Sequence, residues 1–225
     1  MFIVTGASKG LGKAICLRLI KNNKKVLGLA RDTKNLPFKS LNCDISSTEE
    51  IRSIVRIVRK QKLNITGIIN AAGIASMNLA LTTPSVTTEK IVQTNLLGTI
   101  YCCQLFAPFL VRNKNGTIIN FSTIAVSLGL KGESIYAASK AGVESFSRAF
   151  AREMADFNIS VNCIAPGPIK TDLIRGVSQK QVEKIISNQI IQKQFTPESV
   201  CDLVEILIDK RAKTLSGQVF HIGGV

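Results

Sequence analysis

A chain of 225 residues is long enough for one complete hydrophobic core, and we expect a single domain over residues 1–225. The formal net charge of +14 is spread over lysines and arginines without interleaved aromatic residues, so we expect no nucleic-acid binding. The chain has one histidine, and its six cysteines lack Cys-x2-Cys spacing, so we expect no metal site. We see no signal-like start and no apolar run of membrane length, so we expect a cytoplasmic protein without membrane contact.

Strand-like and helix-like segments alternate along the chain. Strands are expected near residues 2–5, 25–30, 40–43, 65–70, 117–122, 158–163 and 217–221. This alternation is typical of a parallel sheet covered by helices on both faces, so we predict an α/β, single-domain, Rossmann-type doubly wound fold. Only Asp32 to Lys39 separate the second strand from the third, which predicts a loop there in place of a crossover helix.

The first strand leads into a glycine-rich turn that opens a helix, with the spacing Gly-x3-Gly-x-Gly. This context is typical of a dinucleotide phosphate site. Gly6 allows the tight turn, Gly10 lets the backbone approach a pyrophosphate, and Gly12 permits close packing of helix on strand. A Walker A loop is excluded, because Ala14 stands where that motif needs a hydroxyl.

A later helix carries a tyrosine and a lysine one turn apart. Tyr136 and Lys140 are spaced i, i+4 and therefore share one face of that helix. A free phenol has a pKa of about 10, and a cation beside it favours the phenolate and lowers that pKa toward neutrality. The pair predicts a tyrosine that gives a proton to a carbonyl or takes one from an alcohol.

Together these motifs resemble the classical short-chain dehydrogenase/reductase family over nearly the whole chain. Further segments match the family in order: Asn70-Ala71-Ala72-Gly73, Asn95 within Thr94-Asn95-Leu96-Leu97-Gly98, Asn162 with Pro166-Gly167 and Thr171, and Leu215-Ser216-Gly217-Gln218 with Gly223-Gly224. The resemblance implies an NAD(P)-dependent oxidoreductase, and the overall look is nearest to 3-oxoacyl-carrier-protein reductases.

The resemblance also implies a set of catalytic and cofactor-binding residues. Asn95 would help hold a water that relays protons to Lys140, which in turn supports Tyr136. Aligning the fifth strand places Thr123 at the position of the family's catalytic serine, with Ser122 as the alternative, and a threonine hydroxyl offers the same donor and acceptors. The residues implied to bind the cofactor are Gly6, Ser8, Lys9, Gly10, Leu11, Gly12, Arg31, Asp44, Ile45, Asn70, Ala71, Ala72, Gly73, Tyr136, Lys140, Pro166, Gly167, Ile169 and Thr171.

The end of the second strand favours NADP (NADPH) over NAD. Members of the family that prefer NAD usually carry an aspartate at the position of Ala30, where it accepts from the ribose 2′-hydroxyl. Here Arg31 follows instead, and Lys9 in the glycine turn is a second cation near the same ribose. An arginine and an ammonium suit a 2′-phosphate. Asp44 matches the residue that contacts the adenine amine in the family.

The predicted function is NADPH-dependent reduction of a ketone to a secondary alcohol, with a 3-oxoacyl thioester as a candidate substrate. Such reductases often dock an acidic carrier protein through two arginines, and Thr117 and Phe157 stand at those positions here. A keto sugar or another small metabolite therefore stays open as the substrate, and a non-catalytic NADP-binding regulator is the alternative of another class. The apolar helices expected over 94–111 and 135–154 predict a homodimer or homotetramer.

Overall fold

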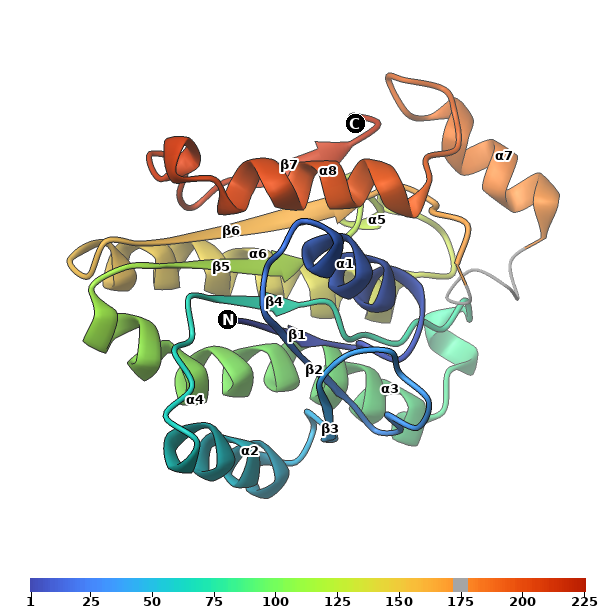
Figure 1. Cartoon of the computed structure of the whole chain (residues 1–225). Coiled ribbons are helices and arrows are strands. Elements are labelled where there is room, and N and C mark those ends of the chain that lie inside the picture. The colour runs from blue at the N-terminus through green and yellow to red at the C-terminus, as the bar shows by residue number, and fades with distance from the viewer. Residues whose placement is uncertain (172–177) are drawn as a thin grey trace.

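The strands form one sheet whose topology confirms the predicted α/β fold. The computed structural model describes residues 1–171 and 178–225, and within them seven strands run parallel in the order β3-β2-β1-β4-β5-β6-β7 (Figure 1). The strands are β1 (Phe2–Thr5), β2 (Val26–Ala30), β3 (Ser40–Asn42), β4 (Gly67–Asn70), β5 (Gly116–Phe121), β6 (Ile159–Pro166) and β7 (Val219–Ile222). Each expected strand is present, with bounds shifted by no more than a few residues at either end.

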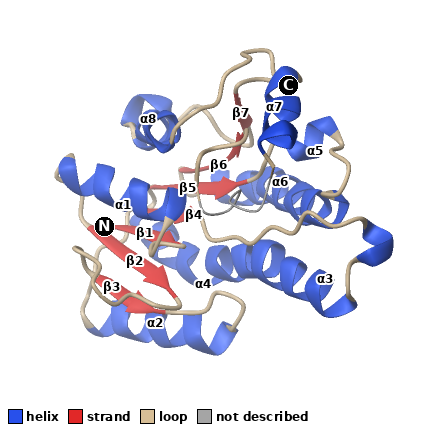
Figure 2. Ribbon diagram, turned by 90° about the vertical axis from the view of Figure 1, so that its right-hand side faces the viewer, coloured by secondary structure: helices blue, strands red, loops and turns tan. Residues whose placement is uncertain are grey.

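Helices cover both faces of this sheet. The main helices are α1 (Gly10–Lys21), α2 (Thr48–Lys60), α3 (Ser85–Val92), α4 (Gly98–Asn113), α5 (Ala125–Leu128), α6 (Ser134–Ala155), α7 (Gln179–Ser187) and α8 (Pro197–Ile208). Figures 1 and 2 show α2, α4 and α6 on one face and α1 and α8 on the other. The helix α7 lies beyond the carboxyl ends of the strands, at the upper right of Figure 1.

Both faces of the strands are buried, as a doubly covered parallel sheet requires. Successive residues of each central strand point to opposite faces. Ile3 and Ile68 belong to the core under α2, α4 and α6, whereas their neighbours Val4 and Ile69 belong to the core under α1 and α8. The near-continuous apolar character of these strands in the sequence follows from this arrangement.

The connection between β2 and β3 is a loop, as its length predicted. Phe38 from this loop packs directly over Gly28 of β2, since a Cβ atom built on Gly28 would lie 2.8 Å from the Phe38 ring. One aromatic side chain therefore covers the part of the sheet where a crossover helix would otherwise lie.

The strand order changes direction at β1: the strands that follow are added first on one side of β1 and then on its other side. This strand pairs with β2 on one side and with β4 on the other, so Thr5 lies opposite both Leu29 and Asn70. The chain leaves β1 and β4 toward different faces, and a crevice opens at their carboxyl ends. In doubly wound sheets ligands bind at this switch point.

The helical stretch Ser85–Asn113 is longer and more apolar than the sequence reading anticipated. By length and composition alone it could cross a membrane, with a mean hydropathy of 1.4 in its most apolar window. However, 44% of that window is buried inside the molecule, and α4 packs on α2 and on the strands β4 and β5. Core helices of soluble proteins meet the same criterion, and this packing accounts for the buried apolar residues of the stretch.

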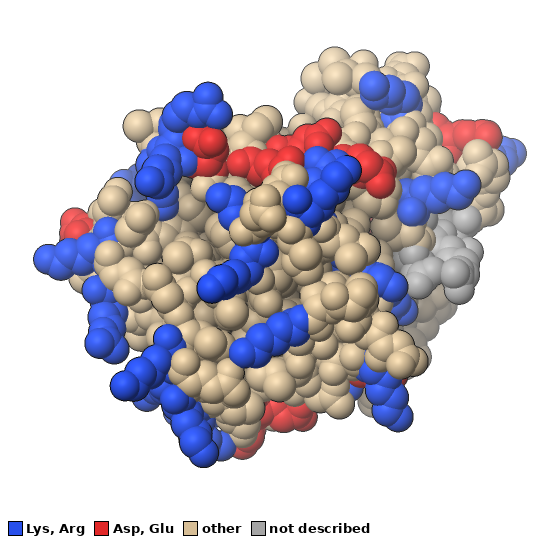
Figure 3. Space-filling model, in the orientation of Figure 1, with Lys and Arg blue, Asp and Glu red and all other residues tan. Residues whose placement is uncertain are grey.

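The surface charge is dispersed over the face that Figure 3 shows. Lysine and arginine side chains are spread around this face, some of them in small groups at its left side, and do not gather in one stripe. Some are paired: Arg18 of α1 binds Asp202 at 2.6 Å and Glu205 at 3.1 Å on α8. This distribution fits a solvated basic surface.

Candidate active site

A cleft of about 340 Å³ lies at the carboxyl ends of β1, β2 and β4. Its lining residues are Gly6, Ser8, Lys9, Gly10, Leu11, Gly12, Ala30, Arg31, Cys43, Asp44, Ile45, Ala71, Ala72, Gly73, Ile74, Ala75, Thr94 and Thr171. Most of the cofactor residues expected from the sequence are therefore brought together in one place. Sequence reasoning missed the backbone-rich wall of Ile74 and Ala75, which follows β4 and carries no polar side chain to mark it.

The glycine turn builds a cradle that fits a pyrophosphate. Gly6 adopts φ +69°, and a Cβ atom on Gly12 would lie 2.3 Å from the carbonyl oxygen of Gly6, so only glycine allows this helix to approach the strand. Lys9 caps α1 with extended backbone and no side-chain hydrogen bond, which leaves the first amides of the helix directed at the cleft. Unpaired amides at a helix N-terminus bind phosphate groups, so these residues fit a dinucleotide.

The far end of the cleft carries charges of both signs. Asp44 accepts hydrogen bonds from the amide and the hydroxyl of Ser46, at 2.9 and 2.7 Å. Burial raises the pKa of Asp44, but the Ser46 hydrogen bonds and the nearby Arg31 outweigh it and hold the pKa below its usual value. Arg31 and Lys9 are exposed, and within residues 1–171 and 178–225 no hydrogen bond or ion pair engages the Arg31 guanidinium.

Tyr136 and Lys140 lie on the buried face of α6, 7% and 4% exposed. Burial, and next the negative charge of Glu133, raise the pKa of the Tyr136 phenol, while a hydrogen bond with Thr123 opposes that shift. Burial also lowers the pKa of Lys140 to about 8, and its ammonium donates to the carbonyl oxygen of Phe121 at 2.8 Å. The expected lowering of the tyrosine pKa by Lys140 is absent: the shift is set by desolvation and by Glu133, and the Lys140 ammonium is turned to the Phe121 carbonyl oxygen.

The two hydroxyls after β5 have different partners. Ser122 donates to the buried carboxylate of Glu144 at 2.5 Å, so its hydroxyl is engaged there although the residue also lines the pocket with Tyr136. The Thr123 hydroxyl instead acts on the Tyr136 phenol, whose pKa it lowers, and it accepts a hydrogen bond from the amide of Ala125 at 3.3 Å. The geometry favours Thr123 as the hydroxyl that shares a substrate atom with Tyr136.

Asn95 lies in a short π-helix, Gln93–Leu97, that joins α3 to α4. Its side-chain amide accepts from the amide of Ile74 and donates to the carbonyl of Ile74, both at 2.9 Å, and it also donates to the Ser139 hydroxyl at 3.1 Å. The side chain thus clamps the segment after β4 against α6. π-Helical turns of this kind occur frequently at functional sites.

Asn70 is a cofactor residue in the sequence prediction, but the structure places it elsewhere. Its side chain is 1% exposed and donates to the Asn120 side chain at 2.8 Å, between β4 and β5. Asn70 therefore supports the sheet beneath the cleft and does not line it. The prediction came from the match of Asn70-Ala71-Ala72-Gly73 to a family segment; in the structure the Asn70 amide nitrogen donates to Asn120, while its side-chain oxygen has no partner among the described residues.

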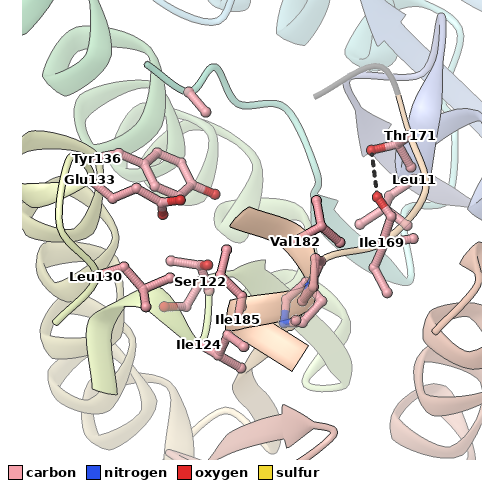
Figure 4. A pocket seen from close by; sticks show the side chains of 15 residues that line it. Leu11, Ser122, Ile124, Leu130, Glu133, Tyr136, Ile169, Thr171, Val182 and Ile185 are labelled. Atoms are coloured by element: carbon pink, nitrogen blue, oxygen red, sulfur yellow. Dashed lines mark hydrogen bonds between the residues drawn. The ribbon is translucent and has the colours of Figure 1, made fainter. Parts of the chain in front are cut away.

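A second, smaller pocket of about 90 Å³ adjoins the cleft (Figure 4). Its lining residues are Leu11, Ala75, Ser122, Thr123, Ile124, Leu130, Glu133, Tyr136, Pro166, Gly167, Pro168, Ile169, Thr171, Val182 and Ile185. Thr123 and Tyr136 therefore face a common space, beside the predicted cofactor residues of the segment after β6. The sequence analysis missed Glu133, which stands directly before α6 and close in sequence to Tyr136.

Within the described part of the chain, no group of three or more His, Cys, Asp or Glu side chains could hold a metal ion. All six cysteines are free and buried. The polar groups of the two cavities are hydroxyls, carboxylates, amines and backbone amides. These groups suit a nucleotide phosphate and a proton transfer.

The family model for short chain dehydrogenase matches residues 1–182, so the chain belongs to the short-chain dehydrogenase family of oxidoreductases, which use a nicotinamide cofactor. One similar relative is the 3-oxoacyl-[acyl-carrier-protein] reductase FabG of Staphylococcus aureus, 27% identical over 99% of this chain and 96% of its own. Another is carbonyl reductase family member 4 of Xenopus tropicalis, 31% identical over 98% of this chain and 95% of its own.

Two solved structures have the same fold. A 4-hydroxyisoleucine dehydrogenase complexed with NADH and succinate matches with a TM-score of 0.91 and 26% identity, over 99% of this chain and 97% of that one. The aldohexose dehydrogenase of Thermoplasma acidophilum matches with a TM-score of 0.89 and 26% identity, over 99% of this chain and 92% of that one. The chain is therefore similar along its length to dehydrogenases and reductases.

Proposed function

We propose that the protein reduces a ketone to a secondary alcohol with NADPH. The observation that carries the proposal is the meeting of Thr123 and Tyr136 in one pocket beside a cleft suited to a dinucleotide. A carbonyl oxygen between these two hydroxyls would receive two hydrogen bonds. The arrangement of Thr123 and Tyr136 thus supports the catalytic roles that were predicted from the sequence.

The residues of the chain divide the work as follows. NADPH, when bound, supplies the hydride that reduces the carbonyl carbon. Thr123 and Tyr136 hydrogen-bond the carbonyl oxygen, and Tyr136 transfers its proton to that oxygen as negative charge develops there. The raised pKa of Tyr136 keeps the phenol protonated until then. Lys140 is positioned by the Phe121 carbonyl to support the tyrosine and the nicotinamide ribose.

Asn95 has a second proposed role beside its structural one. A Cβ atom on Gly73 would lie 3.3 Å from the Asn95 side-chain oxygen and 3.4 Å from the Lys140 nitrogen, so the three residues meet at one point. We propose that Asn95 helps to hold a water that returns protons to Lys140. The closeness of Asn95 to Lys140 supports this relay.

Two substrate classes remain candidates. A 3-oxoacyl thioester is supported by the similarity to a 3-oxoacyl-carrier-protein reductase. A keto sugar or another small metabolite is supported by the similarity to an aldohexose dehydrogenase and a 4-hydroxyisoleucine dehydrogenase. A regulator that binds NADP without turnover is the alternative of another class, and the shared pocket of Thr123 and Tyr136 argues for catalysis instead.

The test is a turnover assay with purified protein. We expect NADPH oxidation, followed at the nicotinamide absorbance, in the presence of acetoacetyl thioesters or small hydroxy ketones. Binding of NADPH is measured separately by the change in its fluorescence. Tight NADPH binding without turnover of any ketone would favour the regulator.

We also propose a cytoplasmic location and a surface that binds neither nucleic acid nor membrane. The six free, buried cysteines support a reducing compartment. The dispersed lysines and arginines support a solvated face.

Cofactor preference is the first prediction. We expect wild-type kcat/KM to be roughly 30-fold higher with NADPH than with NADH, since Arg31 and Lys9 can form charged hydrogen bonds with a 2′-phosphate but are weakened by exposure. Arg31→Ala should remove most of this preference and leave the NADH rate nearly unchanged. Arg52→Ala, an exposed arginine on α2 away from the cleft, is the matched control. Equal wild-type kcat/KM with NADPH and NADH would contradict the proposed binding of a 2′-phosphate by Arg31 and Lys9.

Assembly is the second prediction. The outer sides of α4 and α6 carry half-buried apolar side chains, among them Tyr101, Leu105, Phe109 and Phe146. We propose that these helices pair across a two-fold axis. Light scattering at micromolar concentration should give at least twice the 24.4 kDa of one chain. Leu105→Glu should shift the mass toward one chain, whereas a wild-type monomer would rule the interface out.

A further inference from the structure

A carboxylate projects into the pocket beside the catalytic tyrosine. Glu133 is the residue that precedes α6, but its side chain forms no capping hydrogen bond with that helix. Figure 4 shows the carboxylate of Glu133 and the phenol of Tyr136 entering the pocket from the same side. An acidic residue directly before a helix commonly accepts hydrogen bonds from the first amides of that helix. Glu133 does not have this structural role.

The surroundings of this carboxylate are mainly apolar on the substrate side. Ile124, Leu130 and Ile185 form the neighbouring wall of the pocket. Among the described residues none gives the Glu133 carboxylate a hydrogen bond or an ion pair, and burial raises its pKa. A carboxylate in such a place costs free energy unless a partner supplies donors.

Glu133 also lines an outer cavity, which continues outward from the catalytic pocket. That outer cavity of about 360 Å³ is lined by Met77, Leu79, Leu130, Lys131, Gly132, Glu133, Gln181, Lys184, Ile185 and Asn188. A substrate whose carbonyl lies at Tyr136 must therefore pass Glu133 on its way to the outer cavity. The substituent on the substrate carbon next to the carbonyl is therefore the part that would lie against the Glu133 carboxylate.

We propose that Glu133 determines substrate specificity by accepting a hydrogen bond from a donor on the carbon adjacent to the reacting carbonyl. The inference rests on the proposed ketone reduction and names its substrate class: an α-hydroxy ketone, or an α-amino ketone as the other source of such a donor. Glu133 stands directly before α6 and Tyr136 lies in its first turn, and both side chains enter the same pocket, so a carbonyl oxygen bound by the phenol and a neighbouring hydroxyl bound by the carboxylate can belong to one substrate.

The position of Glu133 also disfavours the binding of a substrate with an unsubstituted acyl chain. A 3-oxoacyl thioester carries methylene groups on both sides of its ketone, and a methylene offers Glu133 no donor. Binding would then remove water from the carboxylate without replacing its hydrogen bonds. Sites built to bond a substrate hydroxyl discriminate strongly against analogues that lack it.

The test compares two ketones of nearly equal shape, 1-hydroxy-2-butanone and 3-pentanone, which differ by a hydroxyl in place of a methyl. Wild-type kcat/KM should favour the hydroxy ketone by about 10-fold or more. Glu133→Met should bring the ratio below about 3, chiefly by raising the rate with 3-pentanone. Glu153→Gln, at an exposed glutamate on α6, is the control and should keep the wild-type ratio.

Two further arms complete the experiment. With 1-amino-2-butanone, Glu133→Gln should lose more activity than with the hydroxy ketone if the natural donor is an ammonium, since an amide keeps an acceptor but no charge. A measurement on the wild type alone covers the case of an unstable variant: 1,2-butanediol should inhibit at least about 10-fold more strongly than 3-pentanol.

The outcomes separate this inference from the function on which it rests. Turnover of both ketones at similar kcat/KM in the wild type, or a preference that survives in Glu133→Met, overturns the role of Glu133 and leaves ketone reduction standing. NADPH binding without turnover of any of these ketones overturns the proposed function, and the inference with it.

Discussion

Tyr136→Phe is expected to bind NADPH like the wild type and to lose at least about 100-fold of kcat, since proton transfer by a positioned side chain contributes that much. Phenylalanine retains the ring that lies 7% exposed on α6, so the pocket wall and the fold are preserved. The measurement is NADPH oxidation at saturating ketone, with cofactor binding followed by fluorescence.

The second tyrosine of the chain provides a matched control. Tyr101 lies half-buried on α4, away from both cavities, and Tyr101→Phe should keep kcat within a few-fold of the wild type. Lys140→Met should lose both turnover and cofactor affinity, because we assign Lys140 to the tyrosine and the ribose alike. Near-normal turnover by Tyr136→Phe would refute the assignment of the proton donor.

Thr123→Val is expected to lower kcat by about 10²–10³, because it removes one of two donors to the developing oxyanion and keeps the side-chain shape. The substitution also removes the hydroxyl that now opposes the rise in the Tyr136 pKa, so the phenol stays protonated across the working pH range. The loss of turnover should therefore be similar at neutral and at alkaline pH.

Ser122→Ala distinguishes the two hydroxyls after β5. It should keep kcat within a few-fold of the wild type but destabilise the fold by about 1–3 kcal/mol, because the buried Glu144 carboxylate loses its donor. Denaturant unfolding measures this second effect. If instead Ser122→Ala abolishes turnover and Thr123→Val does not, the catalytic hydroxyl is Ser122.

The strand pattern and the glycine turn were readable from the sequence because each depends on local chemistry. Apolar runs mark strands buried on both faces, and the spacing of Gly6, Gly10 and Gly12 reflects contacts within a few residues. The loop after Asp32 followed from chain length alone.

The electrostatics of the site could not be predicted in the same way. The direction of the Tyr136 pKa shift depends on how deeply α6 is buried, and the separate partners of Ser122 and Thr123 depend on the position of Glu144. The same limit applies to Glu133, whose importance arises from the walls that other elements place around it. Contacts between distant segments set these properties.

The short connection that Phe38 closes also affects how the edge of the sheet opens. β3 has only three residues, Ser40–Asn42, all of them partly or fully exposed, and one aromatic ring covers β2 beside it. Local unfolding here breaks few contacts, so its free energy is low compared with that of the central strands. If, as we propose, Arg31 and Asp44 hold the dinucleotide, the cofactor would bind only the closed edge and would stabilise it by mass action. Substitutions that loosen Phe38 should then weaken cofactor affinity without touching the cofactor.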